Sequence, residues 1–212
     1  MMIQLFLKVD KIQCIDYKGN ECDQRLVKIL SSFENTRGYV ATRGIDNAIK
    51  NDILTKKYSV RFAFPNILFV LITKRDPKYA MQVEGSDWID LVDEEGYITD
   101  VADNTFLPIL KIGNRIVNPG DNIDKNVLFA LKIVKAVSQT YIVNNAKLKD
   151  DNIEIILKDG YKVIFPNDGD FDTLLGSFKL IVSRLNNLKL DSTIENNKFR
   201  EIDLRYKNPV IR

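Results

Sequence analysis

The sequence predicts a mixed α+β protein of two domains, and three observations lead to this fold class. The first 76 residues follow the order strand, helix, helix, strand, strand. The charged segment 74–77, which contains a proline, then interrupts the apolar pattern. After it, short alternating segments separated by turn residues surround two amphipathic helices, and a closing strand ends the chain. We therefore expect one domain at 1–76 and a second, a mixed β domain with two helices, at 77–212.

The first domain begins with an alternating strand at 11–15, followed by a turn at Gly19 and Asn20. Two helices are predicted next, because apolar residues recur three or four positions apart: Leu26, Leu30 and Phe33 in one, and Ile45, Ala48, Ile49 and Ile53 in the other. We expect Asn20 or Asp23 to cap the first helix and Thr42 to cap the second. Residues 58–64 alternate as a strand, and the apolar run 67–72 is typical of a central strand.

The second domain opens with a predicted hairpin, 88–92 and 97–101, and a further strand around 107–110. A helix follows the turn at 118–120, with two alternative inner faces: Val127, Leu131, Val134 and Val137, or the neighbouring stripe through Leu128. Strands are expected at 142–148, 153–157 and 161–165. The last helix begins near Asp172, and its apolar face is predicted as Leu174, Phe178, Ile181, Leu185 and Leu188. A linker through Asn196 and Asn197 leads to the closing strand.

The closing stretch, 199–212, has the alternation of a half-buried strand. Ile202, Leu204 and Tyr206 fall on one face, and the charged residues between them fall on the other. Pro209 lacks a backbone donor, so regular pairing should fade there. By itself this pattern favours an interior strand with solvated charges, and an edge strand that a partner extends is the alternative.

The composition argues against several classes of function. The 31 basic and 29 acidic residues are interspersed and leave a net charge of +2, which disfavours nucleic acid as a partner. The chain has no histidine, so it lacks the commonest general base and metal ligand. It also contains no glycine-rich phosphate or dinucleotide motif and no nucleophile elbow. We therefore expect no enzyme activity and no cofactor.

Two acidic segments and the two cysteines are alternative candidate sites. The acidic residues between 90 and 103 suit a solvated hairpin better than a metal-dependent hydrolase. The segment 167–172 fails as a calcium loop, because the twelfth position counted from Asp168 is Lys179 and not glutamate. Cys14 and Cys22 are too few for structural zinc; we expect two buried thiols, with one disulfide in an oxidising compartment as the alternative.

Short motifs along the chain are similar, in the same order, to those of the extracytoplasmic part of the bacterial cell-division family FtsQ/DivIB. The most specific is the closing Asp203-Leu204-Arg205-Tyr206, which matches the family's DLRY motif. The others are short: 11–20, 64–68, 74–80, 91–97, 107–108 and 157–160. The resemblance implies a POTRA domain of order β-α-α-β-β, followed by the family's β domain.

The same resemblance implies a non-enzymatic scaffold at the division site, on the extracytoplasmic face of the cytoplasmic membrane. Its partners would be FtsB-like and FtsL-like bitopic membrane proteins, bound by β-strand addition. The family has a transmembrane anchor before the POTRA domain, and here only Met1 to Leu7 could be its remnant, unless this stretch is simply a first strand. A POTRA-bearing chaperone or secretion-machinery subunit, which binds polypeptide clients through the first domain, is the alternative function.

Transferred by motif, the resemblance places partner-binding residues at the end of the chain and on the preceding helix. They are Leu204, Arg205, Tyr206 and Asn208 on the strand, and Phe178, Ile181 and Leu185 on the helix. The family's glycine after the closing tyrosine is replaced around Lys207, Asn208 and Pro209, which changes the local backbone.

Overall fold

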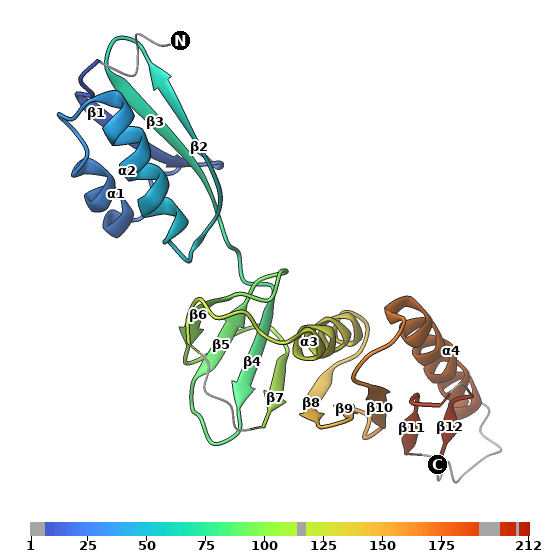
Figure 1. Cartoon of the computed structure of the whole chain (residues 1–212). Helices are drawn as coiled ribbons and strands as arrows, with labels where there is room; N and C mark the ends of the chain where they lie inside the picture. Colours follow the sequence, from blue (N-terminus) through green and yellow to red (C-terminus); the bar gives the residue numbers. More distant parts are fainter. Residues whose placement is uncertain (1–6, 114–117, 191–199, 207) are drawn as a thin grey trace. The chain divides into compact units, whose positions relative to one another are not determined.

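The structure is a computed structural model that describes residues 7–113, 118–190, 200–206 and 208–212, with side chains only to Leu185 in the last helix. Within these ranges it contains four helices and two mixed sheets, so the predicted α+β class is confirmed. The chain divides into two compact units, one up to Asp76 and the other from Pro77 (Figure 1). Each unit has a hydrophobic core of its own.

The first unit is a three-stranded sheet with two helices on one face (Figure 1). Strand β3 (Ile67–Lys74) lies between β1 (Lys11–Asp16), which is parallel to it, and β2 (Thr55–Ala63), which is antiparallel. Helices α1 (Gln24–Ser31) and α2 (Gly38–Lys50) bury their apolar stripes against the sheet. The apolar run of β3 is therefore central in its sheet, as its sequence predicts.

The two helices begin in different ways. Asp23 caps α1 as predicted, since its carboxylate accepts a hydrogen bond from the backbone N–H of Arg25 at 2.8 Å. The predicted cap of α2 is wrong: Thr42 lies inside the helix, and its hydroxyl donates to the carbonyl of Gly38 at 2.8 Å. The first turn of α2 carries exposed apolar side chains, so it does not follow the apolar periodicity from which the start of the helix was predicted. Ile53 lies beyond the helix and is exposed, so its predicted place on the inner face is also wrong.

Cys14 and Cys22 form a disulfide, which corrects the expectation of two buried thiols. The turn around Gly19 folds the chain back, so that the backbone N–H of Cys22 donates to the carbonyl of Cys14 at 3.2 Å. This pairing brings both buried side chains together in the first core. The sequence alone did not predict this contact between two cysteines eight residues apart, because the turn between them creates the contact.

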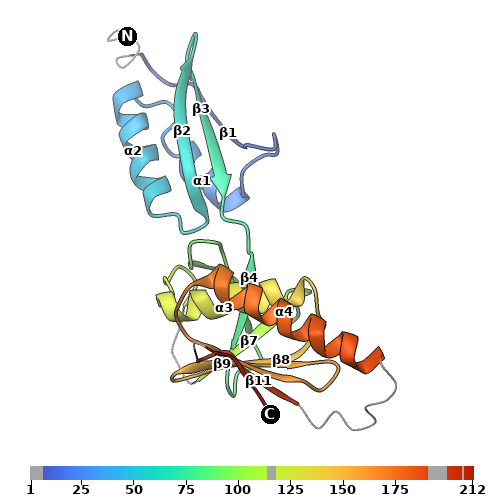
Figure 2. The same cartoon turned by 90° about the vertical axis from the view of Figure 1, so that its right-hand side faces the viewer.

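The second unit is a mixed sheet, in which the described residues form nine strands in the order β12-β11-β10-β9-β8-β7-β4-β5-β6. The strands are β4 (Tyr79–Val83), β5 (Ile89–Val92), β6 (Ile98–Ala102), β7 (Ile109–Ile112), β8 (Val143–Lys149), β9 (Asn152–Leu157), β10 (Lys162–Pro166), β11 (Glu201–Asp203) and β12 (Val210–Ile211). Helices α3 (Lys125–Ser138) and α4 (Phe171–Leu190) cover one face of this sheet (Figure 2). The other face carries charged side chains.

The buried faces of the helices agree with the sequence for α3 and differ in part for α4. In α3 the first of the two alternative stripes, Val127, Leu131, Val134 and Val137, is buried. In α4 the buried residues are Leu175, Phe178, Val182 and Leu185, while Leu174 and Ile181 are only partly buried. The prediction is therefore confirmed for Phe178 and Leu185, whereas Leu175 and Val182 take the places predicted for Leu174 and Ile181. Leu188 and the predicted linker through Asn196 and Asn197 lie outside the described side chains and residues.

Candidate partner-binding surface

The closing segment turns where the sequence predicts a continuous strand. Strand β11 ends at Asp203, whose Oδ1 accepts a hydrogen bond from the backbone N–H of Arg205 at 3.1 Å. This Asx-type turn gives the backbone a local alternative to the ladder of the sheet. The expectation that Arg205 and Tyr206 lie in the strand is therefore wrong.

The side chain of Arg205 closes the turn over Asp203. Its Nε donates to Oδ1 at 2.9 Å and its Nη2 donates to Oδ2 at 2.7 Å, so the contact is bidentate. The carboxylate of Asp203 is fully buried, whereas the side chain of Arg205 is 35% exposed. Hydrogen bonding from Arg205 lowers the pKa of Asp203 below its usual value, and the same contact raises the pKa of Arg205. Asp203 was expected among solvated charges, and the turn buries it instead.

Pro209 precedes a second short strand and does not end the pairing, which corrects the prediction made for it. Strand β12 runs antiparallel to β11, with Ile211 opposite Ile202 and Val210 opposite Asp203. Since β12 covers β11, the edge of the sheet is β12. Arg212 and Glu201 exchange two backbone hydrogen bonds, each N–H donating to the carbonyl of the other at 2.9 Å, so the adjacent Ile202 and Ile211 form a non-hydrogen-bonded pair. The N–H and C=O groups of Ile211 consequently point outward from the edge.

The segment that joins β11 to β12 presents an exposed aromatic residue. Tyr206 is 53% exposed, and the guanidinium of Arg205 lies 5.8 Å from the centre of its ring. Asn208 is also exposed, as is the side chain of Ile211. Leu204, by contrast, is buried in the second core, and its N–H donates to the carbonyl of Ile164. Of the predicted strand residues, Tyr206 and Asn208 are therefore accessible, Arg205 is occupied by Asp203, and Leu204 belongs to the core.

The predicted helix residues belong mainly to the core. Phe178 is fully buried, and its ring lies 5.3 Å from that of Tyr141 and 5.6 Å from that of Phe165. Leu185 is buried in the same cluster, and Ile181 packs against it while partly exposed. A side chain enclosed in this way has no surface to offer a partner, so the docking role expected of Phe178 and Leu185 is corrected. Their spacing marks a buried helix face, which sequence periodicity cannot distinguish from a binding face.

A row of alternating charges on the open face of the sheet leads to the same edge, and sequence reasoning missed it. Lys149 and Lys162 both pair with Glu154, at 2.9 and 3.2 Å. Lys162 also pairs with Glu201 at 3.5 Å, and Glu201 lies 4.0 Å from Arg212 at the end of β12. The row crosses strands that are distant in sequence. The sequence therefore showed only that polar residues alternate within each strand, and not which of them pair across strands. It lowers the pKa of Glu154, where ion pairing outweighs partial burial.

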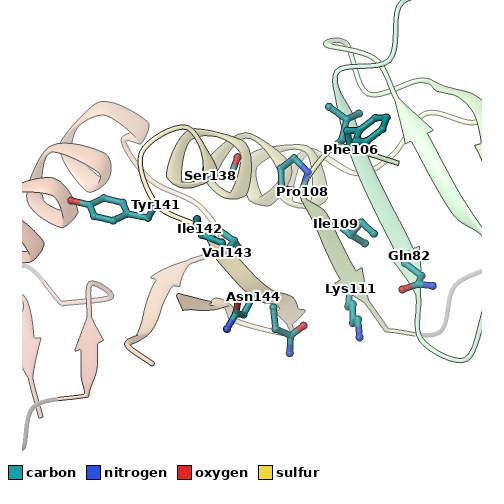
Figure 3. A pocket seen from close by; sticks show the side chains of 12 residues that line it. Gln82, Phe106, Pro108, Ile109, Lys111, Ser138, Tyr141, Ile142, Val143 and Asn144 are labelled. Carbon is teal, nitrogen blue, oxygen red and sulfur yellow. The ribbon is translucent and has the colours of Figure 1, made fainter. Parts of the chain in front are cut away.

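A cavity of about 590 Å³ opens where β7 and β8 separate (Figure 3). These two strands share a single paired position, Lys111 with Lys147. The cavity is lined by Pro108 and Ile109 at the start of β7 and by Ile142 and Val143 at the start of β8. Its lining is mixed, with amide and lysine side chains beside the apolar ones, and it contains no pair of groups arranged for acid–base chemistry.

In the acidic hairpin, a carboxylate accepts hydrogen bonds from the backbone of the turn. Asp93 is buried, and its Oδ1 accepts hydrogen bonds from the backbone N–H groups of Glu95 and Tyr97, both at 2.9 Å. Burial also raises the pKa of Asp90. In the part of the chain that the structure describes, no three histidine, cysteine or acidic side chains cluster in a way that could hold a metal ion.

Comparisons with known proteins return no match, either to the sequence pattern of a protein family or to a curated protein. Among the described residues, no helix is long and apolar enough to cross a membrane.

Proposed function

We propose that this chain is a non-enzymatic scaffold of the bacterial division machinery that binds an FtsB-like or FtsL-like membrane protein outside the cytoplasm. The observation that carries the proposal is the edge formed by β12, with the exposed Tyr206 in the segment that leads to it. The partner would add a strand to β12, starting from the outward N–H and C=O groups of Ile211. Backbone bonds would supply affinity, and the side chains next to the edge would supply selection.

The fold supports this proposal in two ways. The first unit follows the order β-α-α-β-β, with β3 central and both helices on one face, which suits a POTRA domain. The second unit ends its sheet with the segment that contains the DLRY motif, which suits the β domain of the FtsQ/DivIB family. Under this proposal, a membrane anchor would precede the first unit, as it does in that family.

The disulfide supports a location outside the cytoplasm. Cys14 and Cys22 are bonded, and structural disulfides persist in oxidising compartments and are rare in the reducing cytosol. The extracytoplasmic face of the membrane meets this condition.

The turn residues would have different roles in binding. Arg205 would act as a positioning residue, because its bidentate contact with Asp203 fixes the turn at the end of β11 that precedes β12. Tyr206 would be the anchor, since an exposed aromatic side chain buries a large area on contact. An interface of about 1,000 to 1,600 Å² would be expected for such a complex.

The experiment is a calorimetric titration of the protein with a peptide from the extracytoplasmic part of an FtsB-like protein. Tyr206→Glu should weaken binding by about thirtyfold, the equivalent of about 2 kcal/mol for an interface anchor. The matched control is Tyr17→Glu, because Tyr17 is 55% exposed and also has a cation over its ring, Lys18 at 5.5 Å. Equal affinity for wild type and Tyr206→Glu, with both proteins folded, would refute the site.

The same titration separates this proposal from a polypeptide-binding chaperone or secretion subunit. Strand β2 is a nine-residue edge strand of the first unit, so it offers a second place for strand addition. Under our proposal, removal of residues 1–76 leaves the peptide affinity unchanged. Loss of all binding on this deletion would favour the chaperone or secretion subunit instead.

A further inference from the structure

The first sheet has one face that the helices do not cover, and its composition is unusual. Residues that alternate with the buried positions of β1, β2 and β3 point to this outer face. The register places them in rows across the sheet: Lys11, Ile67 and Ala63 in the first, Gln13, Phe69 and Arg61 in the second, and Ile15, Leu71 and Ser59 in the third. Thr73 and Lys57 continue the pattern. We call these residues the outer face.

The outer face is cationic and apolar, and the acidic residue at its margin is Glu21, which a bridge places opposite Ile15 at the end of the third row. Lys11 and Arg61 lie on the flanking strands, on either side of Ile67 and Phe69 in the central strand. Strand β3 is apolar on both faces, although α1 and α2 cover only one of them. An apolar centre between cations is the pattern expected for contact with an anionic, partly apolar surface.

An exposed aromatic residue extends this face at one end. Phe64 lies in the turn between β2 and β3, next to the first row, and is 85% exposed. The same turn contacts the residues that lead into β1: the N–H of Asp10 donates to the carbonyl of Asn66 at 2.9 Å, and the side-chain amide of Asn66 donates to the carboxylate of Asp10 at 3.1 Å. The tip of the hairpin therefore lies at the end of the unit where the N-terminal segment joins it.

We propose that the outer face docks on an anionic lipid bilayer, with Phe64 inserted at the level of the headgroups and with Lys11 and Arg61 on the phosphates. Aromatic side chains favour this interface, and each lysine or arginine near an anionic leaflet adds to the binding. The inference rests on the proposed function in one respect: an upstream anchor would hold the end that carries Phe64 close to the membrane. A single projecting ring needs a matching pocket on a protein partner but none on a lipid surface, so lipid is the favoured occupant.

The first test is co-sedimentation of the whole protein with vesicles of phosphatidylcholine that contain about one third phosphatidylglycerol. Wild type should partition onto these vesicles and only weakly onto pure phosphatidylcholine, and added salt should weaken the binding. Phe64→Ser should lower the partition coefficient about fivefold or more. The matched control is Phe106→Ser, because Phe106 is fully exposed but belongs to the second unit; it should bind as wild type does.

The second test reverses the charges with the double variant Lys11→Glu and Arg61→Glu. Removing a cation should lower the partition about fivefold, so the double variant should fall at least twenty-fivefold. Wild type that fails to sediment with phosphatidylglycerol vesicles would overturn the inference, and so would unchanged partition of both the Phe64 and the charge variants. The affinity for the FtsB-like peptide, measured on the same preparations, reports on the edge at β12, so failure of one proposal is distinguishable from failure of the other.

Discussion

Replacing Asp203 by alanine tests whether the closing turn holds β12 in place. The carboxylate accepts three hydrogen bonds from Arg205: one from the backbone N–H and two from the guanidinium. The backbone bond to a buried charged acceptor contributes about 1.5 kcal/mol. The two guanidinium bonds together add about 1 kcal/mol, because the Arg205 side chain is one-third exposed and regains water when they are lost.

The expected loss is therefore about 2.5 kcal/mol in the free energy of unfolding, a fall of about 8 °C in Tm for a unit of this size. Urea and thermal unfolding, followed by circular dichroism, measure it. Because this turn precedes β12 and Val210 of β12 pairs with Asp203, the affinity for the proposed FtsB-like peptide should fall tenfold or more at a temperature where the variant stays folded. An unchanged Tm with unchanged peptide affinity would refute the reasoning.

The matched control for this variant is Asp93→Ala. Asp93 is also a buried aspartate that accepts two backbone hydrogen bonds in a turn, from Glu95 and Tyr97. It lies in the hairpin of β5 and β6, at the end of the sheet opposite β12. This variant should lose stability and keep the peptide affinity of wild type. A loss of affinity here would mean that general destabilisation, and not the turn at Asp203, controls binding.

Three further predictions concern stability. The pKa of Asp203 is lower in the folded than in the unfolded state, so its carboxylate stabilises the fold at pH values above the unfolded pKa of about 3.9, and this stabilisation is lost as the pH falls through the folded pKa. The free energy of unfolding in urea, measured from pH 7 to pH 3, should therefore decline in acid, and Asp203→Asn should make that decline shallower. Reduction of the disulfide with dithiothreitol should cost roughly 2.5 kcal/mol, from the eight-residue separation of Cys14 and Cys22, and a variant with both cysteines changed to serine should not respond to dithiothreitol. Phe178→Ala should cost about 3 to 5 kcal/mol in thermal unfolding, whereas Leu180→Ala on the exposed side of α4 should change it by less than about 0.5 kcal/mol; equal effects would contradict the core assignment of Phe178.

Local patterns located most of the regular elements. The alternation at 11–15 and the apolar run at 67–72 correspond to β1 and β3, and the spacing of Leu26 and Leu30 corresponds to α1. Periodicity indicates which side of a helix or strand is apolar, and one short segment of sequence is enough to show it. It was less reliable at helix starts, as with Thr42, because exposed apolar side chains in the first turn of α2 blur the pattern.

For the candidate surface, the sequence indicated a segment of the chain but not its local structure. The DLRY motif pointed to the end of the chain, and Tyr206 is exposed there. Alternation alone extended the strand past Asp203, because it contains no information about a carboxylate that bonds to the backbone two residues later. The same limit applies to Phe178, where one apolar stripe is compatible with a core and with a binding face.

The sequence by itself therefore determined the α+β class, the order of strands and helices apart from β4 and β12, and the absence of histidine. Only the tertiary structure decided that Cys14 bonds Cys22, that Asp203 is buried beneath Arg205, and that β12 and not β11 forms the edge of the sheet. The physical reason is that each of these depends on a turn that returns the chain to an earlier segment. Such contacts are set by packing and by side-chain hydrogen bonds, whereas local periodicity reflects one segment at a time.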